Sequence, residues 1–169
     1  FLCHTGDTAD MLAALSTLRG LAASAEARRP IVEEGVLCVL ALAAVKTDCL
    51  ECKREASAIL VLLSLNEQNK FDIVRSQEMK KFVTLTDTDD VECVSQMVRT
   101  LGTISECAEL HEEILQVFPV EELVNLSSPR SDPIIAIEVS RLYANLASNF
   151  NIHASIVKPQ LVNNVGALC

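Results

Sequence analysis

The stretch RRPIVEEGVLCVLAL, residues 28–42, has three counterparts further along the chain. Each contains an aliphatic pair near its start, then a few polar residues, and then a second apolar run. The counterparts are KFDIVRSQEMKKFVTL (70–85), HEEILQVFPVEELVNL (111–126) and HASIVKPQLVNNVGAL (153–168). The first residues of the four pairs are separated by 42, 41 and 42 positions, counted between Ile31, Ile73, Ile114 and Ile156. Such a constant spacing predicts an internal structural repeat.

A second pattern recurs between these stretches with nearly the same period. The pattern consists of two apolar residues three positions apart, and it occurs as Leu18-x-x-Leu21, Leu62-x-x-Leu65, Leu101-x-x-Ile104 and Tyr143-x-x-Leu146. The last residue of each occurrence is called its end point, and successive end points are 44, 39 and 42 residues apart. Apolar side chains mostly stand three and six residues before each end point, which is the spacing of one helix face rather than of a strand. We therefore expect three helices in each unit. A short first helix carries the aliphatic pair, a long third helix carries the second pattern, and the helix between them holds Leu37, Met79, Val120 or Leu161.

Polar segments precede the expected third helices. The segments 46–48, 86–90 and 127–133 are rich in Asp, Ser and Thr, which are favoured at helix N-caps. Pro133 suits the first turn of a helix. These segments are therefore expected to be loops that end in a cap.

Composition narrows the function classes. The chain has 169 residues, of which 50% are hydrophobic, and a formal net charge of −9. High apolar content excludes a disordered chain, and the negative charge disfavours nucleic acid as a partner because phosphate binding needs a basic face. The longest uncharged apolar run, residues 35–45, has 11 residues, which is too short to cross a bilayer. We expect no direct membrane insertion.

The repeat resembles that of the armadillo family. The resemblance rests on the period of about 42 residues, the aliphatic pairs, the junction EGVL at 34–37 and the run YANLAS at 143–148. It implies an all-α fold, a right-handed α-solenoid of about four repeats with incomplete terminal units. We expect one solenoid segment over residues 1–169 that is part of a longer array with flanking repeats in the same chain. The expected units are 1–24 (partial), 25–66, 67–107, 108–149 and 150–169 (partial).

In the armadillo family the third helix lines a concave groove, so the resemblance implies a partner-binding face on these helices. Counting back from the end points of the second pattern selects side chains opposite the core stripe. The expected partner-binding residues are Gln96, Arg99, Thr103, Glu138, Arg141 and Asn145.

Two interpretations of Arg99 and Arg141 stay open at this point. Both occupy the same position of the repeat, and arginine binds carboxylate and phosphate groups bidentately. They could therefore receive an acidic or phosphorylated segment of a partner. They could equally form ion pairs on the surface of this chain, with Glu92, Glu106 or Glu138.

The resemblance favours a non-enzymatic scaffold or adaptor for protein–protein interaction, which binds an extended or helical partner segment along the groove. One alternative is an assembly chaperone similar to the myosin-directed chaperones, whose client-binding domain is an armadillo array. Another is a structural component of a cytoskeletal or ciliary complex. A nuclear-import receptor is disfavoured, because armadillo importins use a ladder of Trp and Asn. This chain has no Trp and matches the Asn position only at Asn145.

The seven cysteines are an odd number without a signal peptide, which favours reduced thiols and a cytoplasmic or nuclear location. Cys38 and Cys93 lie in apolar or helical runs and are expected to pack as small hydrophobes. Cys49-Leu-Glu-Cys52 is a single C-x-x-C pair, which favours ordinary cysteines over a zinc site.

Other catalytic motifs are missing or incomplete. His111-Glu112-Glu113 lacks the second histidine of a zinc protease motif, and the five glycines are too scattered for a phosphate-binding loop. We expect no catalytic residue, no bound metal and no cofactor.

Overall fold

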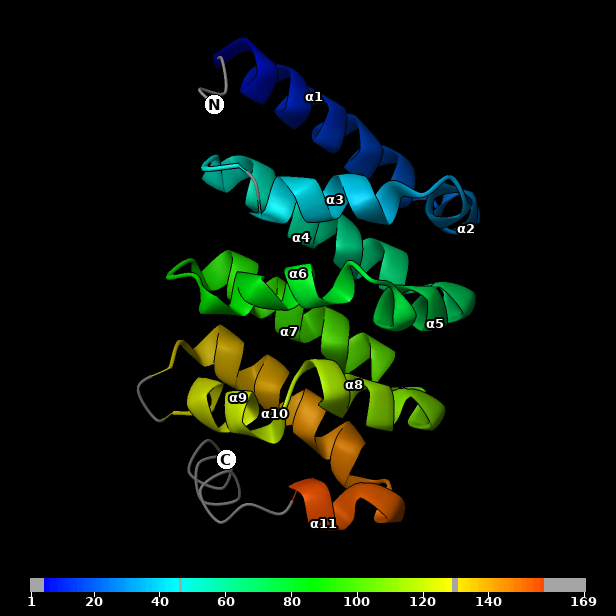
Figure 1. Ribbon diagram of the computed structural model, residues 1–169, viewed down its shortest axis with the longest axis vertical. Helices are drawn as coiled ribbons and strands as arrows, with labels where there is room; N and C mark the ends of the chain where they lie inside the picture. Colours follow the sequence, from blue (N-terminus) through cyan, green and yellow to red (C-terminus); the bar gives the residue numbers. More distant parts are fainter. Residues whose placement is uncertain (1–4, 46, 129–130, 157–169) are drawn as a thin grey trace.

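The computed structural model describes residues 5–45, 47–128 and 131–156, and all regular structure within these ranges is helical (Figure 1). The long helices of the second sequence pattern are α1 (Thr5–Ala22), α4 (Leu50–Ser64), α7 (Val91–Ile104) and α10 (Pro133–Ala147). The shorter elements are α2 (Ala25–Glu33), α3 (Val36–Val45), α5 (Glu67–Arg75), α6 (Met79–Val83), η1 (Thr84–Asp87), η2 (Ala108–Leu110), α8 (His111–Val117), α9 (Val120–Leu126), η3 (Phe150–Ile152) and α11 (His153–Ile156).

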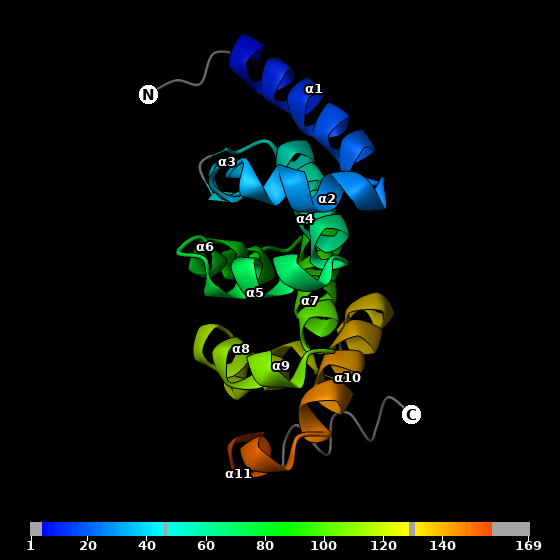
Figure 2. The same ribbon diagram turned by 90° about the vertical axis from the view of Figure 1, so that its right-hand side faces the viewer.

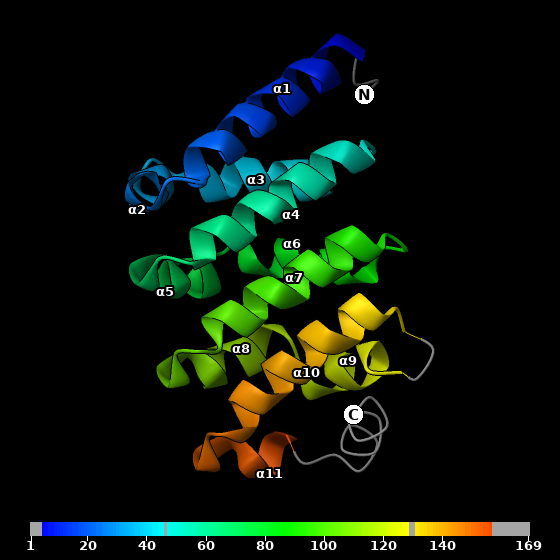
Figure 3. The same cartoon turned by 180° about the vertical axis from the view of Figure 1, so that it is seen from behind.

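The helices form two layers that run along the stack. The helices α1, α4, α7 and α10 lie side by side in one layer, each against the next (Figure 3). The short helices form the second layer beside them (Figure 2). This arrangement is the α-solenoid expected from the repeat.

The core follows the apolar stripes of the sequence. Of the side chains three and six residues before the end points, Ile59, Val98 and Leu101 are buried in the middle of the stack, whereas Leu62 and Tyr143 are half-buried and the end points Leu21 and Leu65 are exposed. The aliphatic pairs contribute to the same cluster, through Val32, Ile73, Val74, Ile114 and Ile156. Because each unit shares this cluster with its neighbours, the core is continuous along the solenoid.

Helix starts follow the expected cap chemistry with one correction. Asp90 caps α7 by accepting the Cys93 N–H, and Asp132 caps α10, with Pro133 in the first turn. The cap of α4 is not Asp48 or Thr47 but Cys49, whose sulfur accepts the N–H of Cys52. A thiol is a weak acceptor, so cap preferences alone do not select it over a nearby aspartate.

The turn between α2 and α3 needs a glycine. Gly35 has a φ of +78°, a backbone conformation in which a side chain clashes with the neighbouring carbonyl. The preceding turn is closed by N–H groups of Glu34 and Gly35, which donate to Pro30 O and Val32 O at 3.0 Å each. The EGVL junction therefore turns the chain between α2 and α3 (Figures 1 and 2).

A basic residue recurs in the short helix that follows a long helix, and its side chain hydrogen-bonds to a backbone carbonyl at the end of that long helix. His111 Nε2 donates to Ser105 O at 2.7 Å, and His153 Nε2 donates to Ala147 O at 2.6 Å, in each case six residues back. Arg28 Nε makes the equivalent bond to Ala22 O at 3.0 Å. A carbonyl at a helix end lacks an intrahelical partner, so these side chains satisfy it.

Two further expectations are wrong in detail. Cys38 is exposed rather than packed in the core, because the buried residues of α3 are Leu37, Leu40, Ala41, Ala43 and Ala44. An all-apolar helix gives no phase signal from which the buried side could be read. The expected loop at 86–90 is shorter, because Thr86 is buried within η1. The second-helix position Leu161 lies outside the described residues.

Candidate protein-binding face

The six expected binding residues come from two adjacent long helices. Gln96, Arg99 and Thr103 stand on α7, and Glu138, Arg141 and Asn145 stand on α10. Spacings of three, four and seven residues place each set along one side of its helix. We call the outward side of α4, α7 and α10 the third-helix face. Because α7 and α10 pack side by side (Figure 3), the two sets meet across this face.

Arg99 and Glu138 form the central contact. Arg99 Nε lies 2.7 Å from Glu138 Oε1, and the exposed fractions of the two side chains are 45% and 8%. Arg141 Nη1 lies 3.8 Å from the second carboxylate oxygen of Glu138. A nearly buried carboxylate is costly unless it is paired, and these two arginines supply the pairing.

Arg141 also reaches back to the end of α7. Its Nη2 lies 2.6 Å from Glu106 Oε1 and 3.5 Å from Thr103 Oγ1. Glu106 is shared, because Lys70 Nζ lies 3.2 Å from its other oxygen. Burial acts to raise the pKa of the Glu106 carboxyl, but hydrogen bonds from Arg141 and Lys70 outweigh it and hold that pKa below its ordinary value. Glu106 is therefore ionised at neutral pH and fixes two cations.

Asn145 and Gln96 connect the helices through neutral hydrogen bonds. Asn145 Nδ2 donates to Gly102 O at 3.1 Å and to Ser105 Oγ at 3.0 Å. Gln96 Oε1 accepts from Ser57 Oγ at 3.1 Å, which joins α7 to α4. The asparagine that matches the importin position thus braces α7 against α10.

The burial of the six residues corrects the sequence expectation. Thr103 and Glu138 are buried, with exposed fractions of 2% and 6% for the whole residue. Neither therefore presents a free side chain to a partner. Gln96 and Asn145 are half-buried, whereas Arg99 and Arg141 are exposed. Of the two interpretations left open for the arginines, the surface ion pair with a neighbouring glutamate is formed in this structure. The arginines are also the groups that remain accessible on the face.

One contact on this face was missed by sequence reasoning. Arg54 of α4 donates Nη2 to Asp90 Oδ2 at 2.6 Å and lies 3.4 Å from Glu92. Arg54 does not occupy the repeat position of Arg99 and Arg141, so counting back from the end points does not select it. The opposite charges of Arg54 and Asp90, 36 residues apart and so nearly one repeat, were the available signal.

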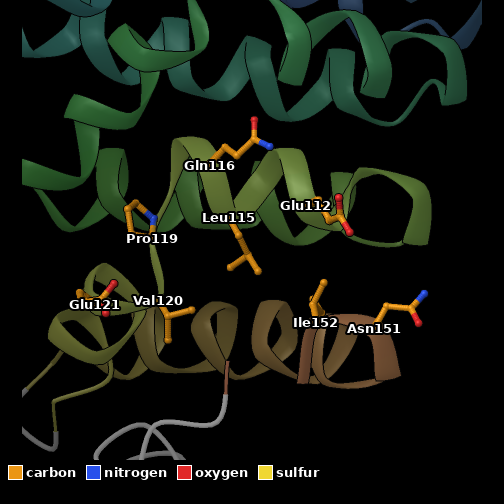
Figure 4. Close-up of a pocket in the computed structure, with 8 residues that line it drawn as sticks. All are labelled: Glu112, Leu115, Gln116, Pro119, Val120, Glu121, Asn151 and Ile152. Carbon is orange, nitrogen blue, oxygen red and sulfur yellow. The ribbon is translucent and has the colours of Figure 1, made fainter. Parts of the chain in front are cut away.

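Two cavities of the described structure lie away from these six residues. A cavity of about 430 Å³ lies between the α8–α9 region and the η3–α11 region (Figure 4). Its ionisable lining residues are Glu112 and Glu121, beside Leu115, Gln116, Pro119, Val120, Asn151 and Ile152. A second cavity, of about 330 Å³, lies at the first turns of α4 and α7 beside Lys53 and Asp89. None of the six expected residues lines either cavity.

The part of the chain that the structure describes holds neither a metal-binding cluster nor a membrane-spanning helix. Within residues 5–45, 47–128 and 131–156, no three His, Cys, Asp or Glu side chains gather closely enough to hold a metal ion. No helix in the same ranges combines the length and apolarity needed to cross a membrane.

Comparison with known proteins identifies the fold. No protein-family model matches the chain, and no curated protein matches it. A designed armadillo repeat protein in complex with the peptide (KR)4 superposes with a TM-score of 0.80 at 17% identity, over 96% of this chain and 75% of that chain. Computationally designed armadillo repeat proteins for modular peptide recognition give 0.79 at 17% identity, over 98% and 76%. An engineered protein gives 0.73 at 24% identity, over 93% and 61%. The chain has an armadillo-like repeat fold.

Proposed function

We propose that this chain is a non-enzymatic scaffold that binds a segment of a partner protein along the third-helix face. The observation that carries the proposal is the pair Arg99 and Arg141. They stand 42 residues apart at the same repeat position, both are exposed, and each is held by a glutamate of the neighbouring element. Groups that are held in place before binding lose less conformational entropy when a partner arrives. The designed armadillo proteins of similar fold, which are described as binding or recognising peptides, support a peptide-binding role for this chain.

The partner segment is proposed to be acidic or phosphorylated. A guanidinium has five N–H donors, and the contact of Arg99 with Glu138 is made by Nε, so further donors serve an incoming carboxylate or phosphate. Packed helices are about 8–10 Å apart, and a chain in the extended polyproline II conformation advances about 3.1 Å per residue and presents every third side chain to the same side. An extended segment would therefore meet the two arginines with acidic groups three residues apart.

The histidine contacts support a binding role over catalysis. A histidine that activates a nucleophile must hydrogen-bond to it. Both histidines of the described ranges, His111 and His153, instead donate Nε2 to backbone carbonyls that end a long helix. Their role in this structure is to hold neighbouring elements together.

The test is a peptide titration followed by fluorescence anisotropy. The probe is a fluorescein-labelled peptide built on Glu-Ser-Ser-Glu, its phosphoserine analogue is the second probe, and Glu-Glu-Ser-Ser is the control of equal charge. Salt is held at about 0.15 M, where the Debye length is about 8 Å, so that the net charge of −9 does not dominate the encounter. We expect the spaced acidic peptides to bind more tightly than the control peptide.

Charge reversal then assigns the site. Arg99→Glu or Arg141→Glu should raise the Kd by about tenfold or more, since a charge-assisted contact becomes a repulsion. Arg75→Glu is the matched control, because Arg75 forms an exposed ion pair between units, with Glu113, but stands on α5 in the other layer. Equal weakening by all three substitutions, or tighter binding of the basic peptide (KR)4, would contradict the acidic-segment proposal.

A further inference from the structure

The first turn of α4 brings together two cysteines that the binding proposal does not use. Cys49 is the N-cap of this helix, and Cys52 is its third residue. Cys49 Sγ accepts the backbone N–H of Cys52 at 3.3 Å. The acceptor at an N-cap is normally a side-chain oxygen. Here the acceptor is the sulfur of Cys49, which is therefore held against the backbone of Cys52.

The spacing of Cys49 and Cys52 allows a bond between the two sulfurs after Cys49 moves toward Cys52. Side chains three residues apart in a helical turn have Cβ atoms about 5–6 Å apart, and a disulfide needs about 3.5–4.5 Å. Cys49 has an extended backbone, with φ −75° and ψ 107°, and so stands outside the helical hydrogen-bond ladder. It can move toward Cys52 at the cost of its own cap contact, while α4 stays intact.

The two thiols have different environments. Cys49 is partly exposed, and its Sγ donates to Glu51 Oε2 at 3.5 Å. Cys52 is fully buried, and its Sγ donates to Thr8 O of α1 at 3.9 Å. Burial, together with a hydrogen bond to Cys49 and the nearby carboxylates, raises the pKa of the Cys52 thiol to about 12. An external reagent therefore meets Cys49 first, and Cys52 stays protonated until it reacts.

We propose that Cys49 and Cys52 form a thiol–disulfide exchange site that reacts with small disulfides of the glutathione class. The thiolate of Cys49 attacks one sulfur of the disulfide, forms a mixed disulfide and releases one glutathione thiolate. Cys52 then loses its proton, attacks the Cys49 sulfur and releases the second glutathione thiolate. The two protein thiols are oxidised by two electrons, the small disulfide is reduced to two thiols, and the two protons pass to the released thiolates.

The other described cysteines lack this arrangement. Cys38 is exposed and its Sγ donates to Gly35 O at 3.1 Å, Cys107 donates to Glu109, and Cys93 is buried at the start of α7. A structural zinc takes four ligands, and no third metal-binding side chain joins the pair within residues 5–45, 47–128 and 131–156. A two-electron bond between the cysteines is therefore the chemistry that the pair can perform by itself.

The test is equilibration of the chain with glutathione and glutathione disulfide at graded ratios, followed by acid quench, alkylation, trypsin digestion and mass spectrometry. Cleavage after Lys46 and Lys53 releases the peptide 47–53, TDCLECK, which holds both cysteines and no others. We expect it to lose two hydrogen atoms and both alkyl groups together as the buffer becomes more oxidising. Cys38 should yield only a mixed disulfide with glutathione.

Two variants test the two steps of the exchange separately. Cys52→Ser should stop at the mixed disulfide on Cys49 and accumulate it about tenfold or more above the wild type, since the intramolecular second step is removed. Cys49→Ser should leave Cys52 reduced. The proposal is overturned if the wild-type peptide carries glutathione on Cys49 as abundantly as Cys52→Ser does, or if it stays doubly alkylated in oxidising buffer while Cys38 reacts.

Discussion

Arg54 and Asp90 join two neighbouring units through a single carboxylate. Arg54 Nη2 lies 2.6 Å from Asp90 Oδ2, and the other oxygen of Asp90 accepts the N–H of Cys93 at 2.9 Å. The same aspartate therefore caps α7 and binds α4. Its side chain is 13% exposed, so water screens this contact less than it screens most ion pairs on the surface.

We predict that Asp90→Asn destabilises the fold at neutral pH and has little effect in acid. The hydrogen bond from Arg54 is the largest cause that holds the pKa of Asp90 at about 2, against the effect of burial. A carboxyl whose pKa is lower in the folded state stabilises the fold above its unfolded pKa, and this contribution is lost as pH falls from about 4 to about 2. We expect a cost of about 1–2 kcal/mol at pH 7.

Urea unfolding followed by circular dichroism, from neutral pH downward, measures this difference. Asp72→Asn is the control, because Asp72 pairs with Arg29 on the surface with 48% of its side chain exposed. It should change the free energy of unfolding by less than about 1 kcal/mol. A cost for Asp90→Asn that stays constant down to the lowest pH would show that the charge of Asp90 is not what stabilises the junction.

Replacement of Gly35 and of Gly20 by alanine should have opposite effects. Gly35 has a φ of +78°, so Gly35→Ala should cost about 1 kcal/mol or more. Gly20 lies inside α1 with no atom within 4 Å of an added Cβ, and Gly20→Ala should stabilise the helix by about 0.5–1 kcal/mol. Thermal unfolding of the two variants checks both signs. A stabilised Gly35→Ala variant would contradict the turn geometry between α2 and α3.

The bond from His111 to the end of α7 should contribute more than its counterpart from His153. His111→Phe keeps an aromatic ring but removes the donor to Ser105 O, which should cost about 1–3 kcal/mol for a buried carbonyl. His153 makes the same bond to Ala147 O but is only partly buried. His153→Phe should therefore cost less. Chemical unfolding of both variants gives the comparison, and a larger loss for His153→Phe would contradict this reasoning.

Sequence reasoning predicted the repeat and the order of helices because both depend on spacing. The aliphatic pairs and the end points of the long helices recur with a nearly constant period. Such a period can be recognised in the sequence without knowledge of the contacts in the fold. It did not predict which way Cys38 points, since every side of α3 is apolar. It also did not predict that Cys49 caps α4, because Asp48 beside it is the better cap by residue type.

The positions of the candidate residues on the long helices were predicted in outline, but their accessibility was not. Helix phase placed Arg99, Glu138 and Arg141 on one side of the long helices. Phase within one helix does not show how closely the next helix approaches. The side chain of Glu138 is nearly covered in the ion pair with Arg99, and Asn145 is used to hold α10 against α7. Such losses of exposure depend on packing between units, which are about 40 residues apart in sequence.

Closure of the proposed disulfide at the start of α4 should depend on pH through Cys52. Because the pKa of its thiol is raised to about 12, the thiolate fraction rises about tenfold per pH unit between pH 7 and pH 9. The measurement isolates the mixed disulfide on Cys49, removes free glutathione disulfide and follows loss of the glutathione adduct at several pH values. A rate that is already constant above neutral pH would place the resolving thiol in a less buried state than this structure shows.

The proposed function depends on binding of a partner segment to Arg99 and Arg141. The most direct test is to observe the side-chain Nε–H NMR signals of the arginines during titration with the Glu-Ser-Ser-Glu peptide, assigning each signal by Arg→Lys substitution. Under the proposal, the Arg99 and Arg141 signals shift together and saturate at one peptide concentration, while the signal of Arg75, whose Nε lies 3.3 Å from Glu113, stays in place. Saturable binding that leaves the Arg99 and Arg141 signals unmoved would contradict it.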